Sequence, residues 1–204
     1  MINQNSRPVI LALTGASGVD YALRLLQCLV AAKVPIYLMV SKAAQIVLSM
    51  ETDLSVPAKS SEMEKYFTEL YKAEKDQIKV YGQQQWTAPI ASGSHRARSM
   101  VVCPCTTGSL ASIANGNSDN LLERAADVML KEKRQLIMVV RETPFSNIHL
   151  ENMLRLSQAG ATIMPANPGF YNNPKSITEI IDFMVARILD HLDIDHDIMP
   201  IWGE

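Results

Sequence analysis

The stretch Pro8-Val-Ile-Leu-Ala-Leu-Thr14-Gly-Ala-Ser-Gly18 decides the fold of this chain. An apolar run of strand length ends in five small residues, and an amphipathic segment of helix length follows directly at 19–33. Small residues let a backbone approach a ligand closely, and N–H groups at the start of a helix favour an anion such as a phosphate. The stretch therefore predicts a strand, a tight anion-binding turn and a helix. A turn that binds no ligand is the alternative.

Apolar runs of strand length alternate with helix-length segments along the rest of the chain. This alternation is typical of a mostly parallel sheet covered by helices, an α/β three-layer sandwich. We expect strands at 9–14, 36–40, 78–81, 100–103, 135–140 and 161–164, with Pro104 ending the fourth. We expect helices at 19–33, 42–51, 61–74, 110–115, 121–133, 148–158 and 177–192, and an irregular segment at 86–94. Without a repeat or a linker, residues 1–204 are predicted to form one domain, with 1–7 and 193–204 as flexible or oligomer-contacting ends.

The bulk composition argues against several classes of protein. The 204 residues carry a net charge of −2, whereas a general nucleic-acid-binding domain carries a basic face. The first seven residues lack the apolar core of a signal peptide, and no run approaches the roughly 20 apolar residues of a membrane span. We therefore expect a soluble, cytoplasmic protein.

The cysteines and histidines do not form a metal-binding pattern. Cys28, Cys103 and Cys105 cannot all pair, and the last two lack the spacing and the second ligand pair of a zinc site. His191 and His196 lie in an acidic stretch without a cysteine or another histidine nearby. We expect thiols that are buried or near the site, and no metal.

The first turn also indicates the class of nucleotide. The NAD fingerprint requires G-x-G-x-x-G and an acidic residue near the end of the second strand. Here Gly15 and Gly18 give only G-x-x-G, and the second strand ends without Asp or Glu. A mononucleotide held by turns and hydroxyls fits better. FMN is favoured because flat apolar faces are available from Trp86, Tyr171 and Trp202.

A second turn of small and hydroxyl-bearing residues, Thr106-Thr-Gly-Ser109, follows the strand at 100–103. Like the first turn, it places hydroxyls and N–H groups at the carboxyl end of a strand. The two turns are expected to face one another across the sheet, at the crevice where open α/β sheets bind ligands.

Several charged residues are candidates for the chemistry. Arg124, Asp127 and Lys131 share one side of a helix, which fits a solvated salt-bridged face or a binding surface. Arg141-Glu142 closes an apolar strand at the edge where α/β sites are built. An arginine there can hold a phosphate and a glutamate can carry a proton. Glu51, at the end of an apolar helix, is a second possible acid or base, or a surface residue.

A series of short motifs identifies a family. They are Thr14-Gly-Ala-Ser-Gly18, Ala91-Ser-Gly-Ser94, Pro104-Cys105, Asp119-Asn-Leu-Leu, Arg124-Ala-Ala-Asp-Val128, Leu130-Lys-Glu132, Arg141-Glu-Thr-Pro144, Ile148-His-Leu150 and Pro168-Gly-Phe-Tyr171. In this order, from about residue 8 to 192, they closely resemble the flavin prenyltransferases, formerly described as 3-octaprenyl-4-hydroxybenzoate or phenylacrylic acid decarboxylases.

The resemblance implies a Rossmann-like flavoprotein that joins a dimethylallyl group to N5 and C6 of reduced FMN. The usual donor is dimethylallyl monophosphate, phosphate leaves, and no metal is needed. The product, prenylated FMN, serves a separate decarboxylase, in ubiquinone synthesis or in aromatic acid breakdown. Members form large homo-oligomers, commonly dodecamers, with the site at subunit contacts.

The resemblance also implies roles for individual residues. The FMN-binding set comprises Gly15, Ala16, Ser17, Ser41, Thr106, Thr107, Gly108, Ser109 and Arg141. The allyl phosphate is expected to bind Tyr171 and Arg187, with positive charge added by Lys131 and Arg124. The chemistry or its pocket is assigned to Glu142, Glu51, Ser17, Lys131 and Trp202.

Two departures from the family pattern occur. Thr106-Thr-Gly-Ser109 replaces the commoner Ser-x-Lys-[ST], so a lysine is missing beside the flavin. His95 stands where a phenylalanine is frequent.

The expected chemistry combines phosphate binding with proton removal. Lys131, Arg141, Tyr171 and Arg187 would stabilise the leaving phosphate, and Glu51, Glu142 or that phosphate would accept the C6 proton. One alternative is an FMN-dependent decarboxylase, which in related enzymes uses a histidine near the start of the chain, whereas all four histidines here lie at 95 or beyond. The other is a non-catalytic subunit that binds or stores FMN.

Overall fold

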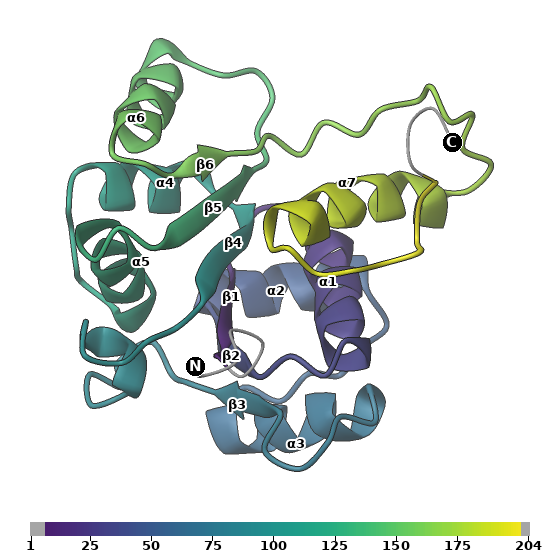
Figure 1. Cartoon of the computed structure of the whole chain (residues 1–204), viewed down its shortest axis with the longest axis horizontal. Coiled ribbons are helices and arrows are strands. Elements are labelled where there is room, and N and C mark those ends of the chain that lie inside the picture. The colour runs from purple at the N-terminus through teal and green to yellow at the C-terminus, as the bar shows by residue number, and fades with distance from the viewer. Residues whose placement is uncertain (1–6, 201–204) are drawn as a thin grey trace.

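The computed structural model describes residues 7–200 and contains one six-stranded sheet (Figure 1). The strand order is β3-β2-β1-β4-β5-β6, and every neighbouring pair is parallel. Sequence order reverses direction between β1 and β4, so their carboxyl ends form the crevice at which such sheets bind ligands. The strands are β1 (Val9–Leu13), β2 (Ile36–Val40), β3 (Ile78–Val80), β4 (Ser99–Cys105), β5 (Gln135–Val140) and β6 (Thr162–Ile163).

Helices cover both faces of this sheet and complete the predicted three layers. One core joins α1 (Val19–Ala31), α2 (Lys42–Glu51), α3 (Ser60–Leu70) and α7 (Ile177–His191) to one face. The other core joins α4 (Thr107–Ala114), α5 (Leu121–Lys131) and α6 (Asn147–Gln158) to the opposite face. Alternate side chains of β1 enter the two cores, Leu11 the first and Ile10 the second. The apolar run that opens the sequence is therefore buried on both sides, as parallel strands usually are. No helix within residues 7–200 has the length and apolar character needed to cross a membrane.

The prediction that Pro104 ends its strand was wrong, because β4 continues to Cys105. Pro104 has no N–H to donate, and the ladder with β5 shifts its register between Val102 and Cys105. The carbonyl of Pro104 still accepts a hydrogen bond from the Thr14 N–H (3.2 Å). The strand therefore passes the proline and brings the second turn beside the first.

Three helices end before the residues expected from the sequence. Lys33, Lys72 and Lys133 have φ values of 56°, 52° and 52°, in the left-handed region. One such residue ends a helix, but lysine gives no sign of that conformation in the sequence. The segment 86–94 is irregular as predicted, apart from a short 3₁₀ turn at Pro89–Ala91.

Candidate active site

Two glycines shape the turn between β1 and α1, for different reasons. A Cβ on Gly15 would lie 2.4 Å from the Cβ of Ala43 in the first turn of α2. Close packing against α2 therefore requires glycine at position 15. Gly18 has φ of +96°, which side-chain-bearing residues rarely adopt. The turn is thus shaped partly by its fit against α2.

A carboxylate already occupies the N-terminus of α1. Glu51, the last residue of α2, accepts hydrogen bonds from the N–H groups of Gly18 (2.8 Å) and Val19 (3.2 Å). In this structure the chain itself therefore supplies the anion that these two N–H groups face. The contact joins residues 33 positions apart, so local sequence patterns do not reveal it.

The surroundings of Glu51 favour its charged form. Partial burial raises the pKa of this carboxyl. Hydrogen bonds from the Ser17 side chain and the two N–H groups, together with the Arg141 charge, more than offset burial, so the net pKa is lowered. Glu51 is therefore ionised at neutral pH and contacts Ser17, the exposed hydroxyl of the first turn.

The second turn lies beside the first and is joined to it by Thr14. The buried hydroxyl of Thr14 donates to the carbonyl of Pro104 (2.7 Å) and accepts from the N–H of Thr106 (2.8 Å). The two predicted turns thus lie side by side at the carboxyl ends of β1 and β4, at the crevice. Sequence reasoning assigned no role to Thr14; its only signal was a hydroxyl at the end of an apolar strand.

The N-terminus of α4 remains open to a ligand. Thr106 accepts from the Ser109 N–H (3.0 Å), and the two hydroxyls lie 3.0 Å apart. Within residues 7–200 no acceptor faces the N–H groups of Thr107 and Gly108. Ser41 caps α2 in the same way, by accepting from the Ala44 N–H (3.0 Å). Four of the predicted hydroxyl-bearing residues therefore lie at helix starts along this edge: Ser41, Thr106, Thr107 and Ser109.

Arg141 and Glu142 follow β5 at the same edge. The Arg141 Nε donates to the carbonyl of Ser17 (3.1 Å), and its backbone N–H donates to the carbonyl of Cys105 (3.1 Å). Glu142 Oε1 accepts from the N–H of Thr143 (2.9 Å). One chain thus brings together most of the predicted residues: Gly15, Ala16, Ser17, Ser41, Glu51, Thr106, Thr107, Gly108, Ser109, Arg141 and Glu142.

The predicted allyl-phosphate residues lie elsewhere in the chain. Arg187 donates to Asp190 (2.8 Å), and Lys131 contacts Glu132 (2.5 Å) and lies against Gly93. Tyr171 is exposed on the loop before α7, with its ring edge-to-face with Phe183.

Arg124 binds the segment before β4. It donates to the carbonyl of Ala91 (3.0 Å) and to Asp127 (2.7 Å). The predicted shared face of α5 therefore carries an Arg124–Asp127 ion pair, whereas Lys131 pairs with its neighbour in sequence. Trp202 falls outside the described residues.

The ends of α5 and α7 show how far these cations are from Arg141. Gln135, the first residue of β5, donates to the carbonyl of His191 (2.5 Å), and Arg98, just before β4, contacts the carbonyl of Leu192. The last turn of α7, one turn beyond Arg187, therefore lies at the amino edge of the sheet. Lys131 ends α5 only four residues before β5 begins. A single chain thus places Arg187 and Lys131 toward the edge opposite Arg141.

The departure from the family pattern at His95 has a structural explanation. Its ring stacks on Tyr37 with 5.4 Å between centroids, and its Nε2 is buried without a hydrogen-bond partner in residues 7–200. The ring therefore packs as a phenylalanine would.

The thiols agree with expectation. Cys103 and Cys105 are buried, Cys28 is half-buried, and all three are free. Within residues 7–200 no group of three or more His, Cys, Asp or Glu side chains could hold a metal ion.

Known proteins resemble the chain over nearly its whole length. The Flavoprotein family model matches residues 2–189. Flavin prenyltransferase UbiX of Pseudomonas aeruginosa is 54% identical over 196 residues, which cover 96% of this chain and 94% of the relative. Flavin prenyltransferase UbiX of Methanocaldococcus jannaschii is 42% identical and covers 96% and 98%.

Solved structures agree with this assignment. The crystal structure of AnUbiX (PadA1) in complex with FMN and dimethylallyl pyrophosphate has a TM-score of 0.87 at 39% identity, covering 98% of both chains. A dodecameric FMN-dependent Ubix-like decarboxylase from Escherichia coli O157:H7 has a TM-score of 0.84 at 37% identity and covers 97% of this chain and 100% of its own. The chain therefore belongs to the flavin prenyltransferase family of flavoproteins.

Proposed function

We propose that this chain is a flavin prenyltransferase that joins the dimethylallyl group of dimethylallyl monophosphate to N5 and C6 of reduced FMN and releases phosphate. The observation that carries the proposal is the meeting of Ser17, Glu51 and Arg141 at the β1–β4 crevice, in a chain 54% identical to a flavin prenyltransferase. A hydroxyl, an ionised carboxylate and a guanidinium there provide a proton acceptor beside a phosphate-binding cation. Reduced FMN, when bound, supplies the nucleophilic ring atoms.

The open start of α4 is where the residues fit the FMN phosphate best. Glu51 occupies the first N–H groups of α1, so a phosphate there would have to displace it. The N–H groups of Thr107 and Gly108 face no acceptor in the described chain, and the hydroxyls of Thr106 and Ser109 lie beside them. Such a helix start binds an anion without the lysine that the family motif usually carries here. Arg141 adds the nearby positive charge.

The carboxylates at the carboxyl edge of the sheet are the groups that can accept the C6 proton of the flavin. Glu51 is ionised and contacts Ser17, so it can accept a proton directly or through that hydroxyl. Glu142 is the second candidate, on the strand end beside Arg141. The lowered pKa of Glu51 makes it a weaker base than an ordinary glutamate, so its role is chiefly to orient Ser17 and Arg141, and Glu142 is the final acceptor.

A second copy of the chain completes the proposed site. Arg187 and Lys131 lie toward the edge of the sheet opposite Arg141, although both are expected to bind the allyl phosphate. Apolar side chains are exposed on several elements, including Ile46, Met50, Ile148, Leu154, Phe170 and Ile177, as expected for a protein that associates. We infer a homo-oligomer, a dodecamer, in which Tyr171, Arg187, Lys131 and Arg124 of one copy meet the reacting edge of another.

We propose that residues 1–204 act as one domain. The product is proposed to pass to a separate decarboxylase that depends on prenylated FMN. Incubation with reduced FMN and dimethylallyl monophosphate under nitrogen tests the activity. A flavin heavier by one prenyl unit supports it. Unaltered flavin would instead support storage, and carbon dioxide released from an added aromatic acid would support the decarboxylase alternative.

A further inference from the structure

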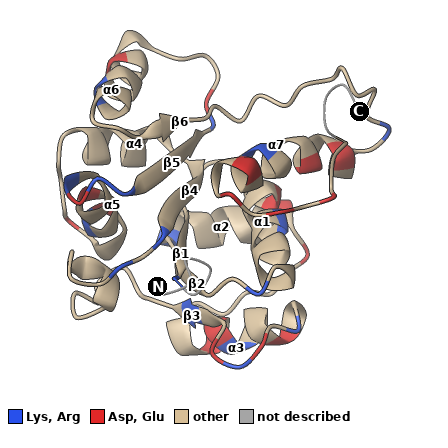
Figure 2. Ribbon diagram, viewed as in Figure 1, with Lys and Arg blue, Asp and Glu red and all other residues tan. Residues whose placement is uncertain are grey.

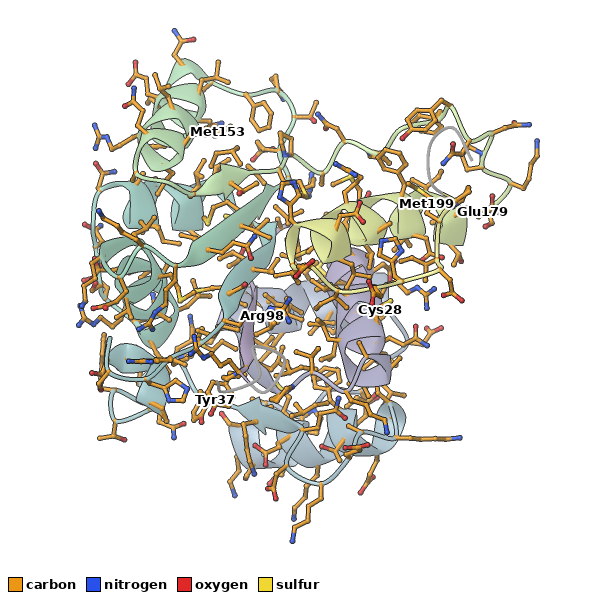
Figure 3. The ribbon with its side chains drawn as sticks, viewed as in Figure 1. Cys28, Tyr37, Arg98, Met153, Glu179 and Met199 are labelled. Carbon is orange, nitrogen blue, oxygen red and sulfur yellow. The ribbon has the colours of Figure 1, made fainter. Side chains whose placement is uncertain are left out.

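The segment after α7 folds back along that helix. Residues 193–200, here called the C-terminal strap, run from the end of α7 toward its start (Figure 1). Aspartates occupy positions 193, 195 and 197 of the strap (Figure 2). Figure 3 labels Met199 of the strap beside Glu179 in the first turn of α7. Ile194 is buried in the core beneath α1 and α7, and Ile198 packs against the same core. The strap is therefore part of the fold.

One carboxylate joins this strap to Arg187. Asp190 Oδ2 accepts from Arg187 Nη1 (2.8 Å), and Asp190 Oδ1 contacts His196 Nε2 of the strap (3.1 Å). A carboxylate only accepts hydrogen bonds, so His196 carries a proton on Nε2. The other ring nitrogen, Nδ1, is buried and has no partner within residues 7–200. Within the described residues, the hydrogen bond to Asp190 is thus the polar contact that orients the His196 ring.

The two ends of this chain of contacts differ in burial. The His196 side chain is 13% exposed, whereas that of Arg187 is 50% exposed. An exposed ion pair three residues apart on a helix restrains an arginine only weakly. Asp190 has a second restraint that such a pair lacks, because the mostly buried His196 contacts its other oxygen. Arg187 therefore has one guanidinium nitrogen paired with Asp190, while half of its side chain remains exposed.

We propose that Asp190 and His196 are positioning residues that hold Arg187 in the orientation in which it binds the phosphate of the allyl donor. The inference rests on the proposed phosphate-binding role of Arg187. An unrestrained arginine loses much rotamer freedom when it binds a ligand, and a pre-oriented one loses less. Asp190 and His196 act through their contacts with each other and with Arg187, so we expect their effect on substrate affinity and not on the chemical step.

The substitution His196→Phe tests the proposal, because it keeps the ring volume and removes the Nε2 donor. We expect the KM for dimethylallyl monophosphate to rise about 3- to 10-fold, because one side chain that binds the substrate is no longer pre-oriented. The kcat should change less than about twofold, and the affinity for FMN should not change. His196→Gln places an amide donor within reach of Asp190 and should restore most of the affinity. His191→Phe is the matched control, since His191 is exposed on the last turn of α7.

A double-mutant cycle separates positioning from a general effect of the strap. In an Arg187→Ala background, His196→Phe should raise the KM no further. An equal rise in both backgrounds, or no rise in the wild-type background while Arg187→Ala raises the KM, would overturn the inference and leave the proposed function intact. An unchanged KM for Arg187→Ala alone would instead remove the proposed role of Arg187, and this inference with it. Urea unfolding of each variant, with His196→Gln as the mild substitution, identifies loss of fold.

Discussion

Glu51→Gln is the substitution with the most informative combination of effects. The carboxylate of Glu51 holds the first two N–H groups of α1 and contacts Ser17, and it lies in the field of Arg141. Glutamine keeps one oxygen acceptor but places an NH₂ group where the second oxygen lies. It also removes the negative charge from the start of α1. We therefore expect a small loss of stability and a large loss of turnover.

The magnitude of the stability effect follows from helix capping. Losing a cap or a charge at a helix N-terminus costs about 0.5–1 kcal/mol at an exposed site, and solvent screening keeps Glu51 at the low end. The folded state lowers the pKa of Glu51 below its ordinary value of 4.5. Its stabilisation is therefore complete above pH 4.5 and is lost as the pH falls through the folded pKa. The difference between wild type and variant should be present at pH 7 and shrink at pH 3.

Two measurements check this prediction. Urea unfolding followed by circular dichroism gives the stability difference at each pH, and anaerobic turnover with excess FMN gives kcat. We expect kcat to fall at least about 100-fold, the range for a lost proton-transfer group or its orienting partner, while FMN still binds. Glu69→Gln, on the exposed face of α3, is the control. A stability difference independent of pH would refute the electrostatic argument, and unchanged turnover would refute the role in chemistry.

Three further substitutions test other parts of the site. Glu142→Gln should bind FMN normally, measured by flavin fluorescence, and lose much of its turnover; a normal rate would remove Glu142 from the chemistry. Arg187→Ala should mainly raise the KM for dimethylallyl monophosphate in steady-state assays, and a lowered kcat with an unchanged KM would contradict phosphate binding. Thr14→Val leaves the Thr106 N–H without its acceptor and the Pro104 carbonyl with only the Thr14 backbone N–H, so it should cost about 1–3 kcal/mol in urea unfolding; a neutral result would mean that the two turns do not depend on this hydroxyl.

Long apolar runs made the sheet predictable from the sequence. The run at Gln135–Val140 has the length of a strand and ends abruptly in charged residues, so both of its limits were predicted correctly. Helix ends were harder, because Lys33, Lys72 and Lys133 adopt a left-handed conformation that glycine usually marks. Pro104 misled for a related reason: its missing N–H matters only where the ladder requires a donor, and the register shift removes that requirement.

The site residues that could be predicted are those that lie at or near strand ends, and the contacts that could not be predicted are made between helices. Thr106 and Arg141 directly follow β4 and β5, and Ser17 lies in the turn after β1, so strand order alone brings them to one edge. The bond from Glu51 to α1 depends on how two helices pack, and no local pattern encodes it. The link from His196 to Asp190 depends on the path of the strap after α7. Sequence pattern therefore locates groups at strand ends but not contacts made between helices.

The central claim is that the reacting edge and the phosphate-binding groups of one site come from different copies of the chain. Mixed oligomers reassembled from Glu51→Gln and Arg187→Ala subunits test it directly, through the amount of prenylated FMN formed. Each variant alone should be nearly inactive at a low concentration of dimethylallyl monophosphate. In random one-to-one oligomers about a quarter of the sites should combine an intact Glu51 with an intact Arg187, and so recover about a quarter of the wild-type activity. If both residues of a site came from the same chain, every subunit would carry one defect, and no activity would return on mixing.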